Sequence, residues 1–299
     1  SVGNGFGKAI GFTQVQELGN LETPVALTNT LSVFTVADAL VDHMLSLPGN
    51  ETIRSVNPVA GETNDGWLND IRGRHVKKKH VLEALDRASE GPVEEGNVGA
   101  GTGTLCLGYK GGIGTSSRKL PKERGEYTVG VLVQTNFGGN LTIMGAPVGE
   151  ELKKISPALA DNTQMLLMEH EDGSCMIVIA TDAPLSARNL ERLAKRSFLA
   201  LGKVGSHMSN GSGDYAIAFS THKDCRIPYR TDQALEFSPE LGNDFMSPLF
   251  QAVVEATEDA IFNSLFMAED MSGQNGRAVE ALPLEQTLEI LDQYGVLNK

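Results

Sequence analysis

Blocks of apolar residues alternate along this chain with polar, turn-forming segments, and their spacing predicts alternating strands and helices. Short apolar runs rich in β-branched residues predict strands at residues 9–15, 25–33, 128–135, 174–181 and 214–221. Apolar positions at helical spacing predict helices at residues 36–47, 77–89, 186–201, 247–271 and 284–294. This order favours a layered α/β fold in which helices cover stacked sheets.

Two segments do not follow either pattern. Residues 96–114 are dense in glycine, but GAGTGT lacks the lysine of a GxxxxGKS/T phosphate loop, and no acidic ribose partner is placed for GxGxxG. We interpret this segment as tight packing or as a loop near an active site. Residues 148–173 are charged and irregular, the least core-like part of the chain. A processing loop would be expected there.

Composition and charge exclude several classes of protein. The 299 residues carry a net charge of −13, which disfavours nucleic-acid binding because that needs a basic stripe. The three cysteines form no CxxC pair, and the histidines show no HExxH pairing, so we expect no metal site. We also expect a reducing compartment, the cytoplasm. No apolar run reaches about 18 residues, so no membrane-spanning helix is expected.

The sharpest change of pattern lies between Gly173 and Ser174, where a polar turn gives way to an apolar run. A serine that opens a core strand after glycine suits a chain that cuts its own backbone. Its hydroxyl would attack the Gly173 carbonyl, and water would release the resulting ester. Ser174 would then carry both a nucleophile and a base, because an α-amino group has a pKa of about 7.7–8.0. Taken alone, Gly-Ser before a strand also fits an ordinary turn.

Two other polar positions could assist such a nucleophile. The sequence NGSGD, residues 210–214, precedes a predicted strand, and its short side chains could bind a hydroxyl or an amine. Asn136 ends an apolar strand, where its carboxamide could donate to an oxyanion. Each also fits an ordinary turn. The chain has no GxSxG motif, so a nucleophile-elbow hydrolase is disfavoured.

Several stretches, in order along nearly the whole chain, resemble the D-aminopeptidase and β-peptidyl aminopeptidase family of self-processing N-terminal-serine hydrolases. They are TNTLSV, NPVAGETNDGWLNDIRGRHV, GNVGAGTGT with KGGIGTSSR, VGVLVQTNFG, GSCMIVIATDAPL, GSHMSNGSGDYAIAFST and NSLFMAEDMSGQNGRAVEALPLEQTLEIL. The resemblance implies one αββα sandwich over residues 1–299, akin to N-terminal-nucleophile hydrolases. It also implies cleavage into two subunits, residues 1–173 and 174–299, that stay together.

The resemblance assigns roles to individual residues. Ser174 matches the nucleophile, Ser212 and Asp214 match the pair that orients the nucleophile and its amine, and Asn136 matches the oxyanion asparagine. The family often has an aromatic residue where Asn64 aligns, and we expect Asn64 and the nearby Trp67 to line the substrate pocket.

The resulting hypothesis is a self-processing aminopeptidase or amidase that acts on short peptides, aminoacyl amides or esters. Neither a metal nor an organic cofactor is expected, and the resemblance suggests a tetramer of processed units. One alternative is an acyltransferase on a related self-processing fold, which passes the acyl group to an amine. The other is an uncleaved, non-catalytic relative that acts as a binding protein.

Overall fold

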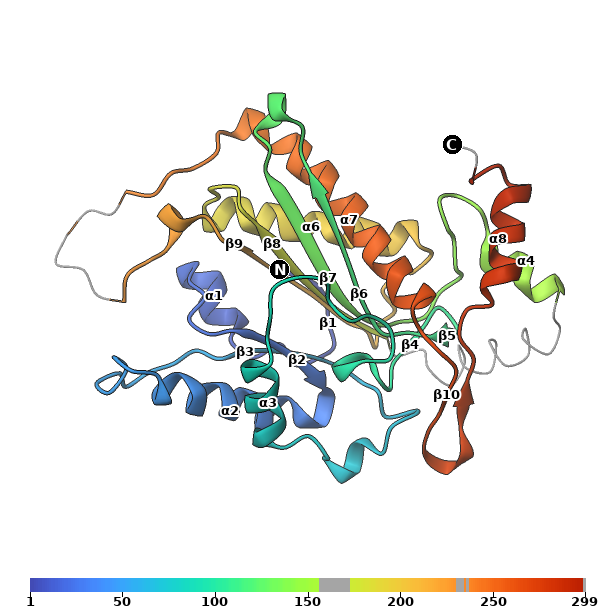
Figure 1. Cartoon of the computed structure of the whole chain (residues 1–299), viewed down its shortest axis with the longest axis horizontal. Helices are drawn as coiled ribbons and strands as arrows, with labels where there is room; N and C mark the ends of the chain where they lie inside the picture. Colours follow the sequence, from blue (N-terminus) through green and yellow to red (C-terminus); the bar gives the residue numbers. More distant parts are fainter. Residues whose placement is uncertain (156–172, 230–233, 235–236, 298–299) are drawn as a thin grey trace.

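Within residues 1–155, 173–229, 234 and 237–297, which the computed structural model describes, the fold centres on a five-stranded sheet (Figure 1). Its order is β1 (Val2–Gly5), β9 (Gly213–Ser220), β8 (Ser174–Thr181), β7 (Thr128–Asn136) and β6 (Ile113–Lys119). The middle strand, β8, runs parallel to β9 and antiparallel to β7. Both faces of β8 are covered, which explains its near-continuous apolar sequence.

Two long helices, α6 (Ala187–Lys203) and α7 (Met246–Phe266), cover one face of this sheet (Figure 1). Apolar residues of both helices and of β7 and β8 form the main hydrophobic core. A Cβ atom on Gly114 of β6 would lie 1.9 Å from the Ala260 carbonyl oxygen of α7. The glycine therefore allows the helix backbone to approach the strand directly.

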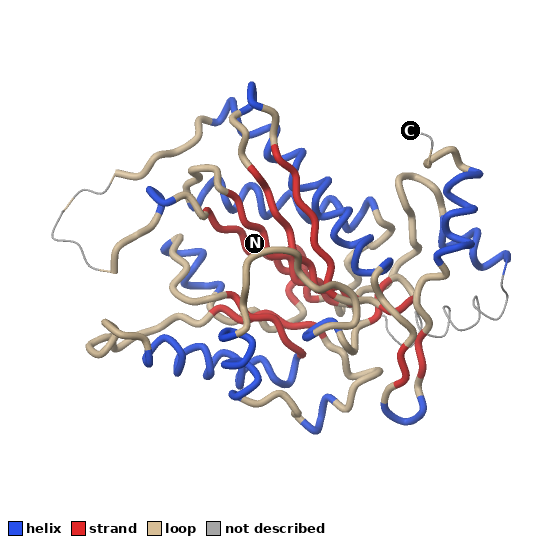
Figure 2. Tube along the Cα trace, in the orientation of Figure 1, coloured by secondary structure: helices blue, strands red, loops and turns tan. Residues whose placement is uncertain are grey.

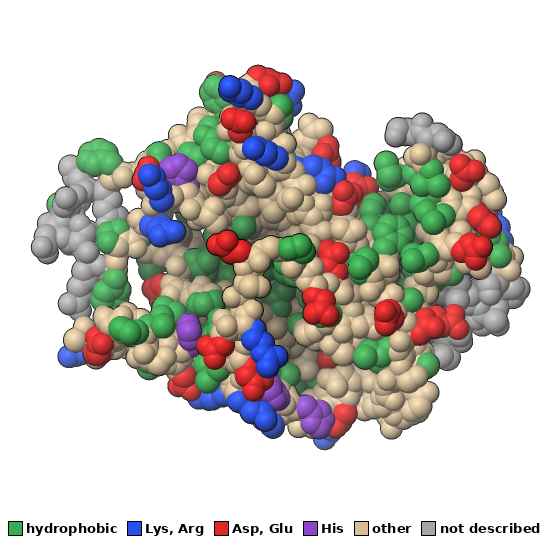
Figure 3. All heavy atoms as spheres, in the orientation of Figure 1, with side chains coloured by type: hydrophobic (Ala, Val, Ile, Leu, Met, Phe, Trp, Pro, Cys, Tyr) green, Lys and Arg blue, Asp and Glu red, His purple; other side chains and the backbone are tan. Residues whose placement is uncertain are grey.

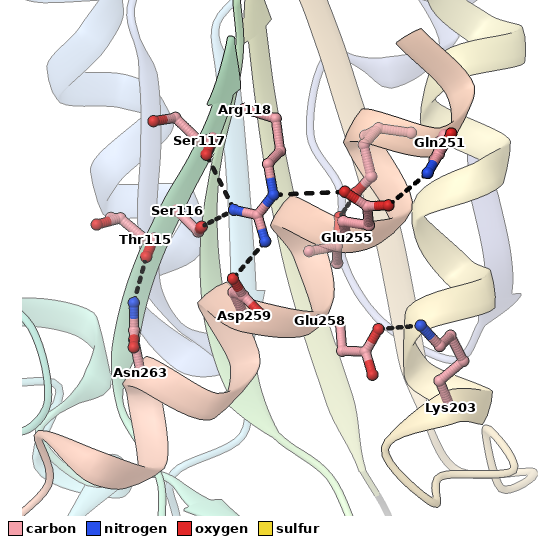
Figure 4. Close-up of polar contacts among 12 residues, drawn as sticks. Thr115, Ser116, Ser117, Arg118, Lys203, Gln251, Glu255, Glu258, Asp259 and Asn263 are labelled. Carbon is pink, nitrogen blue, oxygen red and sulfur yellow. Dashed lines mark hydrogen bonds and ion pairs between the residues drawn. The ribbon is translucent and has the colours of Figure 1, made fainter. Parts of the chain in front are cut away.

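A polar network holds the edge strand β6 against α7 (Figure 4). The Arg118 guanidinium pairs with Glu255, at 3.4 Å from Nε to Oε2, and with Asp259. The same side chain donates to Ser116 Oγ at 3.2 Å and to the Ser117 carbonyl oxygen at 3.0 Å. The network thus holds the edge strand β6 to the helix that covers it.

A smaller, two-stranded sheet with two helices behind it covers the other face of the large sheet. It consists of β2 (Val25–Asn29), β3 (Val59–Thr63), α2 (Val33–Ser46) and α3 (Lys78–Asp86), in which β2 and β3 are parallel. The two sheets touch closely, because a Cβ on Gly61 of β3 would lie 2.2 Å from Met176 Cε of β8. The helices α2 and α3 lie outside β2 and β3 (Figure 1). The layers therefore run α, β, β, α, and the predicted layered fold is confirmed.

The remaining elements lie at the margins of these layers, most of them gathered at one end (Figure 2). They are α1 (Phe12–Leu18), α4 (Val148–Ile155), α8 (Leu284–Gln293), the strand pair β4 (Leu105–Cys106) and β5 (Tyr109–Lys110), and the strand pair β10 (Met271–Ser272) and β11 (Ala278–Val279). Among the described helices, none combines the length and apolar character needed to cross a bilayer.

The predicted elements are most accurate for the central strands of the large sheet. The strand expected at residues 174–181 has those limits, that at 128–135 ends one residue later, and that at 214–221 begins and ends one residue earlier. The helix expected at 247–271 is too long. It ends at Phe266, and Met271 already belongs to β10.

The first part of the chain requires corrections. The strand expected at residues 9–15 is wrong, because residues 12–18 form α1 between Gly11 and Gly19, which have φ angles of 84° and 72°. The strand expected at 25–33 ends at Asn29, whose side chain accepts a hydrogen bond from Ser32 N and so starts the next helical turn.

The irregular segment expected at 148–173 contains a helix in its first part. Residues 148–155 form α4, with Val148 and Leu152 buried. The rest of the expected processing loop, residues 156–172, lies outside the described residues.

Candidate active site

Ser174 is the first residue of the middle strand β8 and is buried. In register, it lies between Asn136 at the end of β7 and Gly213 at the start of β9. Its Oγ donates to the Gly173 carbonyl oxygen, 2.6 Å away. The hydroxyl therefore lies beside the carbonyl group that self-cleavage would attack.

Gly173 is enclosed tightly, and its carbonyl has a second donor. Gly213 N donates to the Gly173 oxygen at 3.1 Å. A Cβ on Gly173 would lie 3.0 Å from Phe137 Cα and 3.1 Å from Ser212 Oγ. Packing, rather than an unusual φ angle, therefore explains the glycine before the serine. Sequence reasoning missed the Gly213 N–H, since it depends on the pairing of two strands far apart in the chain.

The Asn136 carboxamide is buried and held at both ends. Leu105 N donates to Asn136 Oδ1 at 3.0 Å, and Asn136 Nδ2 donates to the Asn64 carbonyl oxygen at 3.0 Å. These contacts fix which end of the amide is the nitrogen. Among the described residues, Asn64 is the one acceptor for Nδ2, so its second proton can meet an oxyanion beside Ser174.

Ser212 and Asp214 lie on the β9 side of Ser174, on either side of its register partner Gly213. Asp214 is in register with Cys175, so its side chain is on the face opposite to that of Ser174. Ser212 Oγ approaches Gly173. Ser212 Oγ therefore lies next to the bond that would be cut, and the Asp214 side chain points away from the face that carries the Ser174 hydroxyl.

The electrostatics of this pair follow from its burial. Burial raises the pKa of Asp214 to about 6, although the nearby Ser212 hydroxyl and the Cys175 backbone lower it in part. Within the described part of the chain, Ser212 Oγ and Asp214 Oδ2 are buried and have no partner with hydrogen-bond geometry. A buried polar atom without a partner is costly, so both have spare capacity for a ligand or a new amine.

The two residues expected to line the pocket have different surroundings. The Asn64 side chain is exposed and accepts from Gly66 N at 3.0 Å, while its backbone supports Asn136. Trp67 is buried in a small hydrophobic cluster, with the Arg277 guanidinium 5.1 Å from its ring centroid. Their role in substrate binding stays a prediction.

Glu62 is a carboxylate near the site that sequence reasoning missed. It is 3% exposed, accepts from Lys8 N at 2.8 Å, and accepts a hydrogen bond from Thr30 Oγ. A Cβ on Gly7 would lie 3.2 Å from Glu62 Oε1 and 3.3 Å from Gly213 Cα, so Glu62 is close to the register partner of Ser174. None of the ion pairs in the described ranges includes Glu62. Little in the sequence marked Glu62, because it stands at the start of a polar, turn-rich stretch, whereas in the structure it belongs to β3.

No group of three His, Cys, Asp or Glu side chains suited to a metal ion occurs in the part of the chain that the structure describes.

The αββα layering and similar solved structures together define the class of protein. The chain has 35% identity and a TM-score of 0.89 to an L-aminopeptidase D-Ala-esterase/amidase from Ochrobactrum anthropi, described as a variant of the Ntn hydrolase fold. That match covers 99% of this chain and 80% of the other. A β-aminopeptidase from Burkholderia sp. has 40% identity and a TM-score of 0.88, with coverage of 99% and 80%. The fold is therefore that of an Ntn hydrolase.

The family follows from the sequence comparisons. The model of peptidase family S58 matches residues 1–279, and the chain belongs to this family. A β-peptidyl aminopeptidase, BapA, from Sphingosinicella microcystinivorans is 42% identical over 97% of this chain and 74% of its own length. These findings confirm the predicted self-processing serine aminopeptidase or amidase. They do not favour the acyltransferase or the non-catalytic binding protein.

Proposed function

We propose that Ser174 is the nucleophile of this aminopeptidase and that the chain exposes it by cutting its own backbone after Gly173. One observation carries the proposal: Ser174 Oγ and Gly213 N both donate to the Gly173 carbonyl oxygen, at 2.6 and 3.1 Å. The hydroxyl is beside the carbonyl carbon it must attack, and a backbone N–H is on the oxygen that becomes negative. These contacts favour attack at this bond.

The cleavage transfers an acyl group twice. Ser174 Oγ bonds to the Gly173 carbonyl carbon, the C–N bond breaks, the hydroxyl proton passes to the released nitrogen, and an ester joins the two parts. Water then hydrolyses the ester, which leaves a carboxylate on Gly173 and a free amine on Ser174. The products are residues 1–173 and 174–299, which remain parts of one domain.

In turnover, the same hydroxyl attacks the carbonyl of the substrate's N-terminal residue. The Ser174 amine accepts the hydroxyl proton and later gives it to the leaving amine. Asn136 Nδ2 and backbone N–H groups stabilise the oxyanion. Ser212, which lies beside the cut bond, and Asp214 on the same strand hold the amine. Water finally releases the acyl group from Ser174.

The substrate class follows from the carboxylate of Glu62. A buried carboxylate near Ser174, outside every ion pair of the described ranges, is suited to the free ammonium group of a substrate. We propose short peptides, aminoacyl amides and aminoacyl esters as substrates, with Asn64 and Trp67 at the pocket wall. Because two similar proteins are β-peptidyl aminopeptidases, amides of β-amino acids belong in the first panel beside those of L- and D-amino acids.

We also propose a homo-oligomer, a tetramer of processed units, in the cytoplasm and without a nucleic-acid partner. The resemblance to the family supports the oligomer. All three cysteines are free, which suits a reducing compartment. Basic side chains on the face in Figure 3 lie in small separate groups among acidic ones, and the net charge of −13 opposes binding to phosphate backbones.

Hydrolysis of an aminoacyl p-nitroanilide panel tests the function. We expect turnover by the wild type and complete loss in Ser174→Ala, and residual activity of Ser174→Ala would overturn the assignment of the nucleophile. Adding hydroxylamine or an amino-acid ester as acceptor separates hydrolysis from acyl transfer. We expect the free acid to remain the main product. A main product with the acceptor attached would instead support the acyltransferase.

A further inference from the structure

Lys110 is a lysine with no exposed surface, on the short strand β5 within the glycine-dense segment 96–114. Its Nζ donates to the Gly101 carbonyl oxygen at 2.9 Å and to the Gly111 carbonyl oxygen at 2.6 Å. The ammonium group thus joins two points within the glycine-dense segment, Gly101 and Gly111. The proposed reaction gives Lys110 no role.

A buried amine at this position is energetically unfavourable. Burial lowers the pKa of Lys110 to about 7, although nearby Cys106 and Asp65 favour the charged form. No ion pair of the described ranges includes Lys110, so two carbonyl oxygens replace its water shell. A methionine has a similar shape and would avoid the desolvation. This cost suggests that the contacts of Lys110 have a purpose other than stability.

The part of the loop that Lys110 closes is the part that orients Asn136. Between the two carbonyls bound by Lys110, the loop supplies Leu105 N, which donates to Asn136 Oδ1 at 3.0 Å. Two further hydrogen bonds hold the same part of the loop together. Gly111 N donates to the Thr104 carbonyl oxygen at 3.0 Å, and Thr104 Oγ donates to the Gly101 carbonyl oxygen at 3.0 Å. These contacts add to the β4–β5 pairing of Leu105 with Lys110 and so help to hold Leu105 in position.

We propose that Lys110 is a positioning residue for the oxyanion site: it closes the glycine-dense loop so that Leu105 N holds the Asn136 carboxamide with its nitrogen toward Ser174. This inference rests on the proposed function of Asn136. If the loop opens, Oδ1 loses its donor and the amide can rotate. An oxygen rather than an N–H can then face the developing negative charge, which repels it.

A double-mutant cycle tests whether Lys110 acts through Asn136. In the wild-type background, we expect Lys110→Met to lower kcat by about 10- to 100-fold with KM within about 3-fold, since a lost orientation affects the transition state. Asn136→Ala should lower kcat by about 10²- to 10³-fold. In that background, Lys110→Met should change kcat by less than about 2-fold. The matched control is Lys119→Met, an exposed lysine on the adjoining strand β6, which should keep wild-type kcat.

Two further measurements keep the test decisive if Lys110→Met folds poorly or Asn136→Ala is too slow. Thr104→Val removes the other side-chain donor to Gly101 with little change of shape, and we expect kcat to fall by about 3-fold with KM unchanged. A crystal structure of Lys110→Met should show Leu105 N beyond hydrogen-bond distance of Asn136 Oδ1, and one of Thr104→Val should show a longer contact between the same two atoms.

The inference is overturned by wild-type kcat in Lys110→Met, or by an equal fall of kcat in both backgrounds. A retained contact between Leu105 and Asn136 together with a lower kcat also overturns it. Failure of the proposed function gives a different result, since wild type and Lys119→Met would then both lack hydrolysis.

Discussion

The two sides of Ser174 differ in how their polar groups are satisfied. On the β7 side, Asn136 is bonded at both ends, to Leu105 N and to the Asn64 carbonyl. On the β9 side, Ser212 Oγ and Asp214 Oδ2 are buried and lack a partner with hydrogen-bond geometry among the described residues. The polar group on the β7 side has its hydrogen bonds made and does not titrate. The β9 side has polar atoms without hydrogen-bond partners and a carboxyl whose pKa is raised.

This difference fits two tasks in one reaction. Stabilising an oxyanion needs a donor that is oriented in advance, because reorientation during the reaction would cost free energy. Moving a proton needs a titratable neighbour and room for a new amine, because the amine appears only after cleavage. We therefore expect changes on the β7 side to lower the rate at every pH, and changes on the β9 side to alter its pH dependence.

The largest effect on the β7 side should come from Asn136→Ala. Loss of an oxyanion donor should lower kcat by about 10²- to 10³-fold, and by the same factor between pH 6 and pH 9. Steady-state kinetics on processed enzyme measure this. A fall of kcat at only one end of this pH range would contradict our view that the β7 side holds a fixed donor that does not titrate.

Gly173→Ala should affect cleavage of the chain. An added Cβ would lie about 3 Å from Phe137 and Ser212 and would displace the carbonyl from Ser174 Oγ and Gly213 N. We expect self-cleavage to slow by about 10- to 100-fold, measured as the cut fraction over time by intact mass. Gly202→Ala on α6, with open space around the added atom, is the matched control. Cleavage of Gly173→Ala at the wild-type rate would show that this packing is irrelevant to the reaction.

Asp214→Asn should change pH dependence on the β9 side. We expect kcat/KM to fall by about 10-fold at pH 7 and the acid side of its pH profile to change, because a neutral amide replaces the titratable carboxyl. The control is Asp244→Asn, which alters an exposed carboxylate. An unchanged pH profile would remove Asp214 from the proton transfer.

The same variant makes a prediction about stability. Burial raises the pKa of Asp214 from 3.8 to about 6, so the folded chain binds this proton more tightly than the unfolded chain does. The favourable contribution is complete below about pH 4 and is lost as the pH rises to about 6, a change of about 3 kcal/mol. Denaturant titrations should therefore show less loss of stability between pH 4 and pH 7 in Asp214→Asn than in the wild type.

The smallest effect should come from Arg118→Met, at the edge of the sheet away from Ser174. Loss of the network with Glu255 and Asp259 should lower the free energy of unfolding by about 1 kcal/mol, because these groups are partly exposed. Activity should not change, and Lys119→Met should affect neither quantity. A large loss of activity in Arg118→Met would mean that the rigidity of the β7 side depends on the whole sheet.

The sequence was sufficient where the relevant information is local. The limits of β8 could be predicted because a polar turn and an uninterrupted apolar run meet at Ser174. The strand expected at residues 9–15 was wrong, because two glycines enclose a helix of only seven residues, too short for a clear period.

The site was predictable by residue type but not by arrangement. Family resemblance drew attention to Ser174, Asn136, Ser212 and Asp214, yet their division between two sides of β8 depends on strand register. Lys110 gave no signal, since a lysine in a glycine-rich segment is normally expected at the surface. Its burial results from contacts between segments that only the folded chain brings together.

The most direct test of the central claim is intact-mass spectrometry of freshly purified, denatured wild type and Ser174→Ala, followed over several days. Our account predicts two wild-type species that divide between Gly173 and Ser174, and one uncut species for Ser174→Ala. A wild type that hydrolyses aminoacyl amides while its chain stays uncut, or a Ser174→Ala chain cut at the same bond, would contradict it.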